Sequence, residues 1–125
     1  MNKLKLIAAT ALIAATGATA VASPALASSA TPTKVTIKGH EGDYYGYVQS
    51  SDSNCESNRE VKVYEMLGSS PSPKTDNLIG SDIAQPNGPD GMWSIGNSGY
   101  KHGEFYAKVK KTSECGGDIS KVISR

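Results

Sequence analysis

The stretch "GPDGMWSIGN" (residues 88–97) decides the fold, because it holds the only tryptophan of the chain directly after a Pro-Asp-Gly turn. Trp93 and Ile95 flank Ser94, which is the alternation of a β-strand with one apolar side. Two interpretations are open: a ligand platform on a loop, or the centre of a small core. Because the rest of the chain has little other aromatic bulk, we expect Trp93 in the core, with the platform as the alternative.

Outward from Trp93, short alternating apolar runs are separated by clusters of turn residues. This pattern predicts an all-β, seven-stranded antiparallel sandwich of the Ig-like type. The expected strands cover 34–39, 43–50, 59–67, 77–85, 92–97, 104–112 and 119–125, and "GHEGD" (39–43) predicts a hairpin between the first two. The expected core residues are Val35, Ile37, Val48, Val61, Val63, Trp93, Ile95, Phe105, Ala107 and Val109.

The first 27 residues have the pattern of a secretory signal peptide. Lys3 and Lys5 precede a long Ala-rich apolar run, and Ala25-Leu26-Ala27 matches a cleavage site. The alternative is a permanent membrane anchor, which the weak hydrophobicity of alanine disfavours. We expect cleavage after Ala27, secretion, a flexible lead-in over 28–33 and one domain over 34–125, with no membrane insertion after cleavage.

The charge balance excludes one class of partner. Of the 13 basic residues the signal segment holds two, so 11 remain against 12 acidic residues. A domain without a basic excess is not expected to bind nucleic acid.

The two cysteines, Cys55 and Cys115, are predicted to form one disulfide, because paired cysteines in an exported chain are usually oxidised. The alternatives are two free thiols or a metal site. A bridge that closes a loop of this length stabilises the fold by about 4 kcal/mol in the chain-entropy model.

No catalytic constellation stands out. The serines lie in turn clusters, and no G-x-S-x-G motif is present. His40 and His102 lie in polar loops. They are either two separate exposed histidines, or they come together as a metal or acid–base site. Two acidic loops offer side-chain oxygens that could bind Ca²⁺. The turn hydrogen bonds that Asp and Asn commonly form explain these residues equally well. We expect no catalytic residue, metal or cofactor; the calcium candidates left open are Asp52, Asn54, Glu56, Asn87 and Asp90.

Four tyrosines are the candidate binding residues. Tyr45 and Tyr47 alternate with the apolar positions of one predicted strand and therefore form an outward aromatic pair, which Tyr100 and Tyr106 extend. The alternative is ordinary cross-strand packing on a solvated sheet. Three lysines on another predicted strand, with Lys62 across from them, form a basic stripe that either protects a sheet edge or binds an anionic polymer: Lys108, Lys110 and Lys111.

The segment "IGSDIAQPNGPDGMWSIGNSGYKHGEFYAKVKK" (79–111) resembles the carboxypeptidase regulatory-like domains, which belong with the transthyretin-like and Cna-B-type sandwiches. The shared motifs are Ser81-Asp82, the Asp90-Gly91 turn, the aromatic-x-apolar Trp93–Ile95, and a glycine-led aromatic strand over 103–109. The resemblance covers most of 34–125. It implies a β-sandwich and a non-catalytic role such as an accessory, adhesion or carbohydrate-associated module.

We therefore expect a secreted, monomeric, non-enzymatic interaction module that acts through exposed tyrosines and loops on a rigid scaffold. Its partner is an extracellular protein or a cell-surface polysaccharide that the sequence does not identify. Two alternatives are a small-ligand or carbohydrate-binding protein, and a secreted protease inhibitor that presents the loop "GSSPSPKTDN" (68–77).

Overall fold

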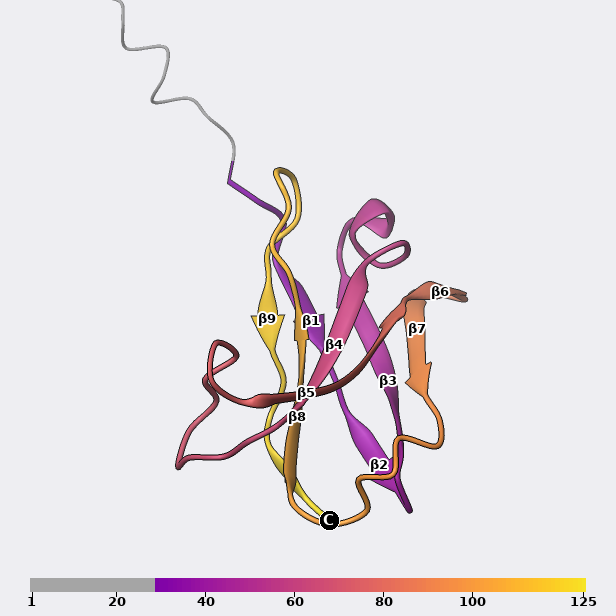
Figure 1. Cartoon of the computed structure of the whole chain (residues 1–125). Coiled ribbons are helices and arrows are strands. Elements are labelled where there is room, and N and C mark those ends of the chain that lie inside the picture. The colour runs from indigo at the N-terminus through magenta and orange to yellow at the C-terminus, as the bar shows by residue number, and fades with distance from the viewer. Residues whose placement is uncertain (1–28) are drawn as a thin grey trace, which may run out of the picture.

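The computed structural model describes residues 29–125, which form an all-β structure of two antiparallel sheets (Figure 1). The predicted signal peptide and its cleavage site lie outside the described residues. These residues form ten strands and one short 3-10 helix: β1 (Thr33–Val35), β2 (Lys38–His40), β3 (Asp43–Ser50), η3 (Ser53–Cys55), β4 (Glu60–Glu65), β5 (Asn77–Ile83), β6 (Gln85–Asn87), β7 (Asp90–Ile95), β8 (Glu104–Val109), β9 (Asp118–Ile119) and β10 (Ile123–Ser124).

The first sheet has the order β1-β3-β7-β6, and β2 also pairs with β3. The second sheet has the order β10-β8-β4-β5, and β9 also pairs with β8. Each sheet therefore has one edge made of two short strands in succession.

The predicted count of seven strands is not confirmed, for two reasons. The expected strands over 34–39 and 119–125 are each interrupted. In addition, the stretch "PNGPDG" (86–91), expected as a turn, is part of a short hairpin. In this hairpin Gln85–Asn87 forms the extra strand β6, which pairs antiparallel with Asp90–Met92 at the start of β7. A Gly-Pro turn between them allows the chain to reverse within two residues.

The hairpin expected at "GHEGD" is confirmed. His40 pairs with Asp43, and the two residues between them, Glu41 and Gly42, have φ values of 51° and 91°. Positive φ at both central positions is the geometry that joins strands with their natural twist in a two-residue loop.

The core lies between the two sheets around Trp93, which is 1% exposed. This burial excludes the ligand-platform interpretation. Of the other expected core residues, all but Ile95 belong to the buried cluster, and Ile95 is partly buried against it. Tyr44 and Ala84 complete the cluster, and the Tyr44 and Phe105 rings pack with their centroids 4.8 Å apart.

A hydrogen bond from Trp93 interrupts the edge of the first sheet that β1 and β2 form. The indole Nε1 donates to the carbonyl oxygen of Thr36 at 3.2 Å, between β1 and β2. Gly46 makes room for this carbonyl, since a Cβ there would lie only 2.0 Å from the Thr36 oxygen. The backbone at Thr36 therefore bends toward the core, and the edge divides into two short strands.

One end of the sandwich is closed by the predicted disulfide. Cys55, in η3, bonds Cys115, in the loop between β8 and β9, with a Cα–Cα separation of 5.5 Å. The chain before β1 joins this end, because Thr31 exchanges backbone hydrogen bonds with Glu114 and Gly116. Part of the lead-in expected over 28–33 is thus bonded to the body of the domain.

A buried arginine supports the same two loops. Arg59 is 4% exposed, and its guanidinium donates to the carbonyl oxygens of three loop residues at 2.8–2.9 Å: Cys55, Lys110 and Gly116. It also donates to the Thr33 hydroxyl at 3.2 Å. Burial lowers the pKa of Arg59, but a guanidinium stays protonated in proteins. The cation therefore bonds carbonyls that would otherwise be left unsatisfied.

Candidate functional site

The most exposed aromatic surface lies on the outer side of the first sheet. Tyr45 and Tyr47 project from β3 and are 40% and 38% exposed. Met92 of β7 lies directly across from Tyr47 and is 39% exposed. We call these three residues the tyrosine face. Because β3 is paired along both of its edges, the face stands on an inner strand of the sheet rather than on a mobile loop.

The hydroxyl groups separate the surface tyrosines from the structural ones. Tyr44 points into the core, and its hydroxyl donates to the Tyr100 carbonyl at 2.6 Å. Burial raises the pKa of Tyr44. Within residues 29–125, by contrast, the hydroxyls of Tyr45 and Tyr47 have no hydrogen-bond partner. They are available to a ligand.

The expectation that Tyr106 belongs to an exposed stripe is wrong. Tyr106 lies on β8 in the second sheet, is 0% exposed, and stacks on Tyr64 with a centroid separation of 5.4 Å. Its hydroxyl donates to Oδ2 of Asp76 at 2.6 Å. Burial first, and then this hydrogen bond, raise the pKa of Tyr106. Strand alternation indicates that Tyr106 points outward, but it does not indicate that a loop covers this side. The prediction of an exposed Tyr106 is wrong for this reason.

Tyr100 is exposed but does not join the tyrosine face. It lies in the loop between β7 and β8, is 37% exposed, and its carbonyl bonds a tyrosine that points away from that face. The predicted group of four is therefore divided, and only Tyr45 and Tyr47 stand together.

The loop at 68–77 is held by Asp76. Its carboxylate accepts the N–H groups of Leu67 at 3.0 Å and Ser72 at 2.7 Å in addition to the Tyr106 hydroxyl. The Leu67 and Tyr106 hydrogen bonds are the main reasons that the pKa of Asp76 is lowered. The carboxylate thus fastens the loop over the outer side of the second sheet.

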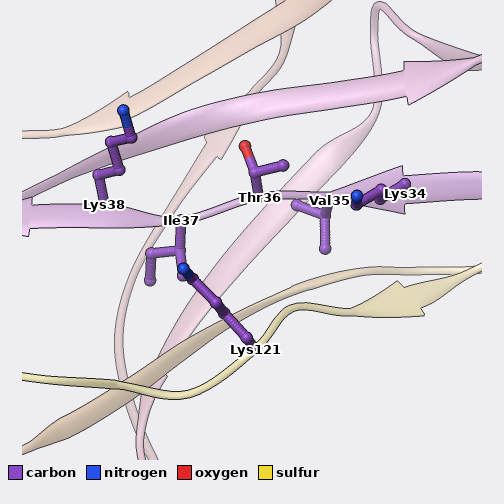
Figure 2. Close-up of a pocket in the computed structure, with 6 residues that line it drawn as sticks. All are labelled: Lys34, Val35, Thr36, Ile37, Lys38 and Lys121. Carbon is purple, nitrogen blue, oxygen red and sulfur yellow. The ribbon is translucent and has the colours of Figure 1, made fainter.

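A basic hollow borders the tyrosine face. It lies between the β1–β2 edge and the segment joining β9 to β10, has a volume of about 430 Å³, and is lined by Lys34, Val35, Thr36, Ile37, Lys38 and Lys121 (Figure 2). Lys38 is the cross-strand neighbour of Tyr45, and Lys34 that of Gln49. The alternation of "KVTIK" (34–38) already placed Lys34 and Lys38 on one side, but only the structure brings Lys121 opposite them.

The acidic loops are explained by local hydrogen bonds. Asp52 accepts the Asn54 N–H at 2.9 Å, the buried Glu56 accepts the Ser50 N–H at 3.3 Å, and Asp90 accepts the Gln49 amide at 3.3 Å. Across 29–125, no group of three or more His, Cys, Asp or Glu residues is arranged to hold a metal ion.

The two histidines are both exposed. His40 ends β2, and His102 lies in the β7–β8 loop, whose Ser98 bonds the carbonyl of Gly42 in the β2–β3 turn. Their loops therefore meet at the same end of the sandwich, away from the disulfide.

Comparison with protein families, with curated proteins and with solved structures finds no match to this chain. In the described part of the chain, no helix is both long enough and apolar enough to cross a membrane.

Proposed function

We propose that this protein is a secreted, monomeric, non-enzymatic binding module, and that its ligand is a polysaccharide chain that lies on the tyrosine face. The observation that carries the proposal is the pair Tyr45 and Tyr47, exposed side by side on an inner strand with hydroxyls that bond no described residue. Tyrosine has an apolar ring and a polar tip, which suits the C–H faces and hydroxyl groups of sugars.

The geometry of the sheet supports an extended ligand. Residues two apart on a strand point to the same side and stand about 7 Å from each other. Tyr45 and Tyr47 thus form a row, and Met92 widens it toward β7. An extended chain can contact both rings at once, and the rings lose little freedom on binding because the strand already orders them.

The finer description of the fold is part of this proposal. When β1–β2 and β9–β10 are each counted as one interrupted strand and β6 as a short addition, seven main strands form an Ig-like sandwich around a buried tryptophan. The resemblance of 79–111 to carboxypeptidase regulatory-like domains supports a binding rather than a catalytic role. The Cys55–Cys115 disulfide is compatible with an extracellular protein, as the predicted signal peptide requires.

The test is a thermal-shift screen of the purified protein against soluble polysaccharides, followed by titration of each hit. A ligand at 100 times its dissociation constant adds about 2.7 kcal/mol to the unfolding free energy, which shifts the melting temperature by many degrees in a domain of this size. We expect Tyr45→Ala and Tyr47→Ala to lose this shift and to keep the melting temperature of the free protein.

Tyr100→Ala is the matched control, since it removes an equally exposed tyrosine outside the tyrosine face. Normal polysaccharide binding by both face variants contradicts the proposal. If no polysaccharide binds and the face variants instead lose a protein partner in a pulldown, the ligand is a protein and not a sugar chain.

The Asp76 contacts favour a second candidate function, protease inhibition by the loop at 68–77. An inhibitory loop must hold one backbone conformation, and here a single carboxylate bonds three points of the loop and the sheet beneath it.

A further inference from the structure

We propose that the basic hollow is an anion subsite, and that the polysaccharide bound by this protein is acidic, with uronate-type carboxylates. This inference rests on the proposed function and specifies its ligand class. It is carried by three lysines, Lys34, Lys38 and Lys121, that line one hollow beside the tyrosine face.

The hollow is a consequence of the interrupted edge. The Thr36 carbonyl turns inward to Trp93 across Gly46, so the chain between β1 and β2 is set back from the outer edge of the first sheet. Figure 2 shows the Lys121 side chain extending toward Ile37 from the facing segment, with Lys34 and Lys38 at either side of Thr36. The receding backbone, Val35 and Ile37 form the floor. Lys121 reaches this floor from the facing segment, whereas Lys38 points to the outer side of the sheet with Thr36.

The three lysines have no acidic partner in the described chain. Within residues 29–125 the one ion pair joins Lys101 to Glu41, and neither of these residues lines the hollow. Asp118 lies across from β1, but its carboxylate accepts the Val35 N–H at 2.8 Å and pairs with none of the three lysines. Three ammonium groups against this one carboxylate leave the hollow with a net positive charge, which can attract an external anion.

The spacing of the lysines indicates a chain with repeated charges. Lys34 and Lys38 are four residues apart on an edge that runs at about 3.3 Å per residue, so their Cα atoms stand roughly 13 Å apart. A single phosphate or carboxylate cannot span that distance. Since Lys38 adjoins Tyr45 across the strands, one acidic sugar chain can contact the tyrosine face with its rings and the hollow with its carboxylates.

The experiment compares polygalacturonate with its fully methyl-esterified form, in which the sugar chain is the same and the charges are removed. We expect polygalacturonate to bind about tenfold more tightly at low salt, because three exposed ion pairs each contribute modestly. The difference in affinity should vanish in about 1 M salt, where the Debye length falls to about 3 Å and exposed ion pairs are screened.

The variant that tests the hollow is Lys34→Gln/Lys38→Gln/Lys121→Gln. It should bind both polymers with the affinity that the wild type has for the ester. Lys74→Gln/Lys101→Gln/Arg125→Gln, which removes the same charge from exposed positions outside the hollow, should keep the tenfold preference. Equal binding of the two polymers by the wild type, or equal losses in the two triple variants, overturns the inference.

Two further outcomes separate this inference from the proposed function. Ester binding that depends on Tyr45 and Tyr47, without preference for the charged polymer, retains the tyrosine face and overturns the anion subsite. Poly-L-glutamate that binds as tightly as polygalacturonate and depends on the same lysines overturns the sugar assignment and indicates an acidic peptide.

Discussion

Trp93 and Thr36 are joined by a hydrogen bond of 3.2 Å that passes across Gly46, the one position of β3 where no side chain separates them. The indole is buried and has a single donor, so the Thr36 carbonyl satisfies it. The same contact bends the edge of the first sheet and opens the basic hollow. One buried residue thus links the core to the surface proposed to bind ligand.

Replacement of Trp93 by phenylalanine should destabilise the fold by about 2 kcal/mol or more, because it removes both buried volume and the hydrogen bond to Thr36. Urea unfolding measures this change. Ser94→Ala, at the next and exposed position of the same strand, should stay within about 0.5 kcal/mol of wild type. A Trp93→Phe variant as stable as Ser94→Ala would contradict the structural role given to the indole.

Gly46→Ala should be among the most damaging small substitutions in the chain. Its Cβ would lie 2.0 Å from the Thr36 oxygen, so the backbone must move, at a cost of about 3 kcal/mol or with failure to fold. Gly68→Ala is the matched control, since no atom lies within 4 Å of the added Cβ there. Equal melting temperatures for the two variants would show that the close approach is absent.

Reduction of Cys55–Cys115 should lower the melting temperature by roughly 15–30 °C, because the bridge spans a sequence separation of 60 and contributes about 4 kcal/mol. Arg59→Lys should also destabilise, by about 2 kcal/mol, since one ammonium cannot satisfy the carbonyls that the guanidinium bonds.

Arg59 and the disulfide hold the same two loops, so their effects should not add. We expect Arg59→Lys to cost less in the reduced protein than in the oxidised one, as measured by unfolding with and without reductant. Strict additivity would mean that the two features act independently.

Asp76 should make the stability depend on pH on the acid side. Its pKa is lowered in the folded protein, so its contribution is complete above the ordinary carboxyl pKa of about 4 and is lost as the pH falls through the lowered value. Urea midpoints between pH 7 and pH 2 should therefore fall less in Asp76→Asn than in wild type. Glu104→Gln, at an exposed carboxylate without a hydrogen-bond partner in 29–125, should follow the wild-type curve; if it flattens the curve equally, Asp76 is not the cause.

The loop at 68–77 should resist proteolysis while Asp76 holds it. Trypsin has one target inside the loop, after the exposed Lys74. We expect the folded protein to remain uncut there and Asp76→Ala to be cut at least tenfold faster, as followed by mass spectrometry of timed digests. Rapid cleavage of the wild type after Lys74 would remove the inhibitor candidate.

Much of the fold is predictable because strand alternation reports which side of a strand is buried. Val35, Val48, Val61 and Phe105 follow that rule, and Trp93 lies where the alternation places it. The interruption at Thr36 was not predictable, since it depends on a carbonyl that turns toward an indole distant in sequence.

The candidate site was predictable only in part, for a related reason. Tyr45 and Tyr47 are exposed as their alternation indicates, whereas Tyr106 follows the same outward pattern and is nevertheless buried. Its burial depends on a loop fastened by Asp76, 30 residues earlier in the chain. Local pattern gives the side of a sheet to which a residue points, and it does not report what covers that side.

The covered tyrosines also set the valency of the molecule. Within residues 29–125, Tyr106 is hydrogen-bonded to Asp76 of the loop and its stacking partner Tyr64 is also buried, so only the first sheet presents an exposed aromatic row on its outer side. Under the proposed function, a single copy therefore has one point of attachment. It would coat a polysaccharide without cross-linking it, leaving a dilute polymer solution free-flowing where a two-sided binder would gel it.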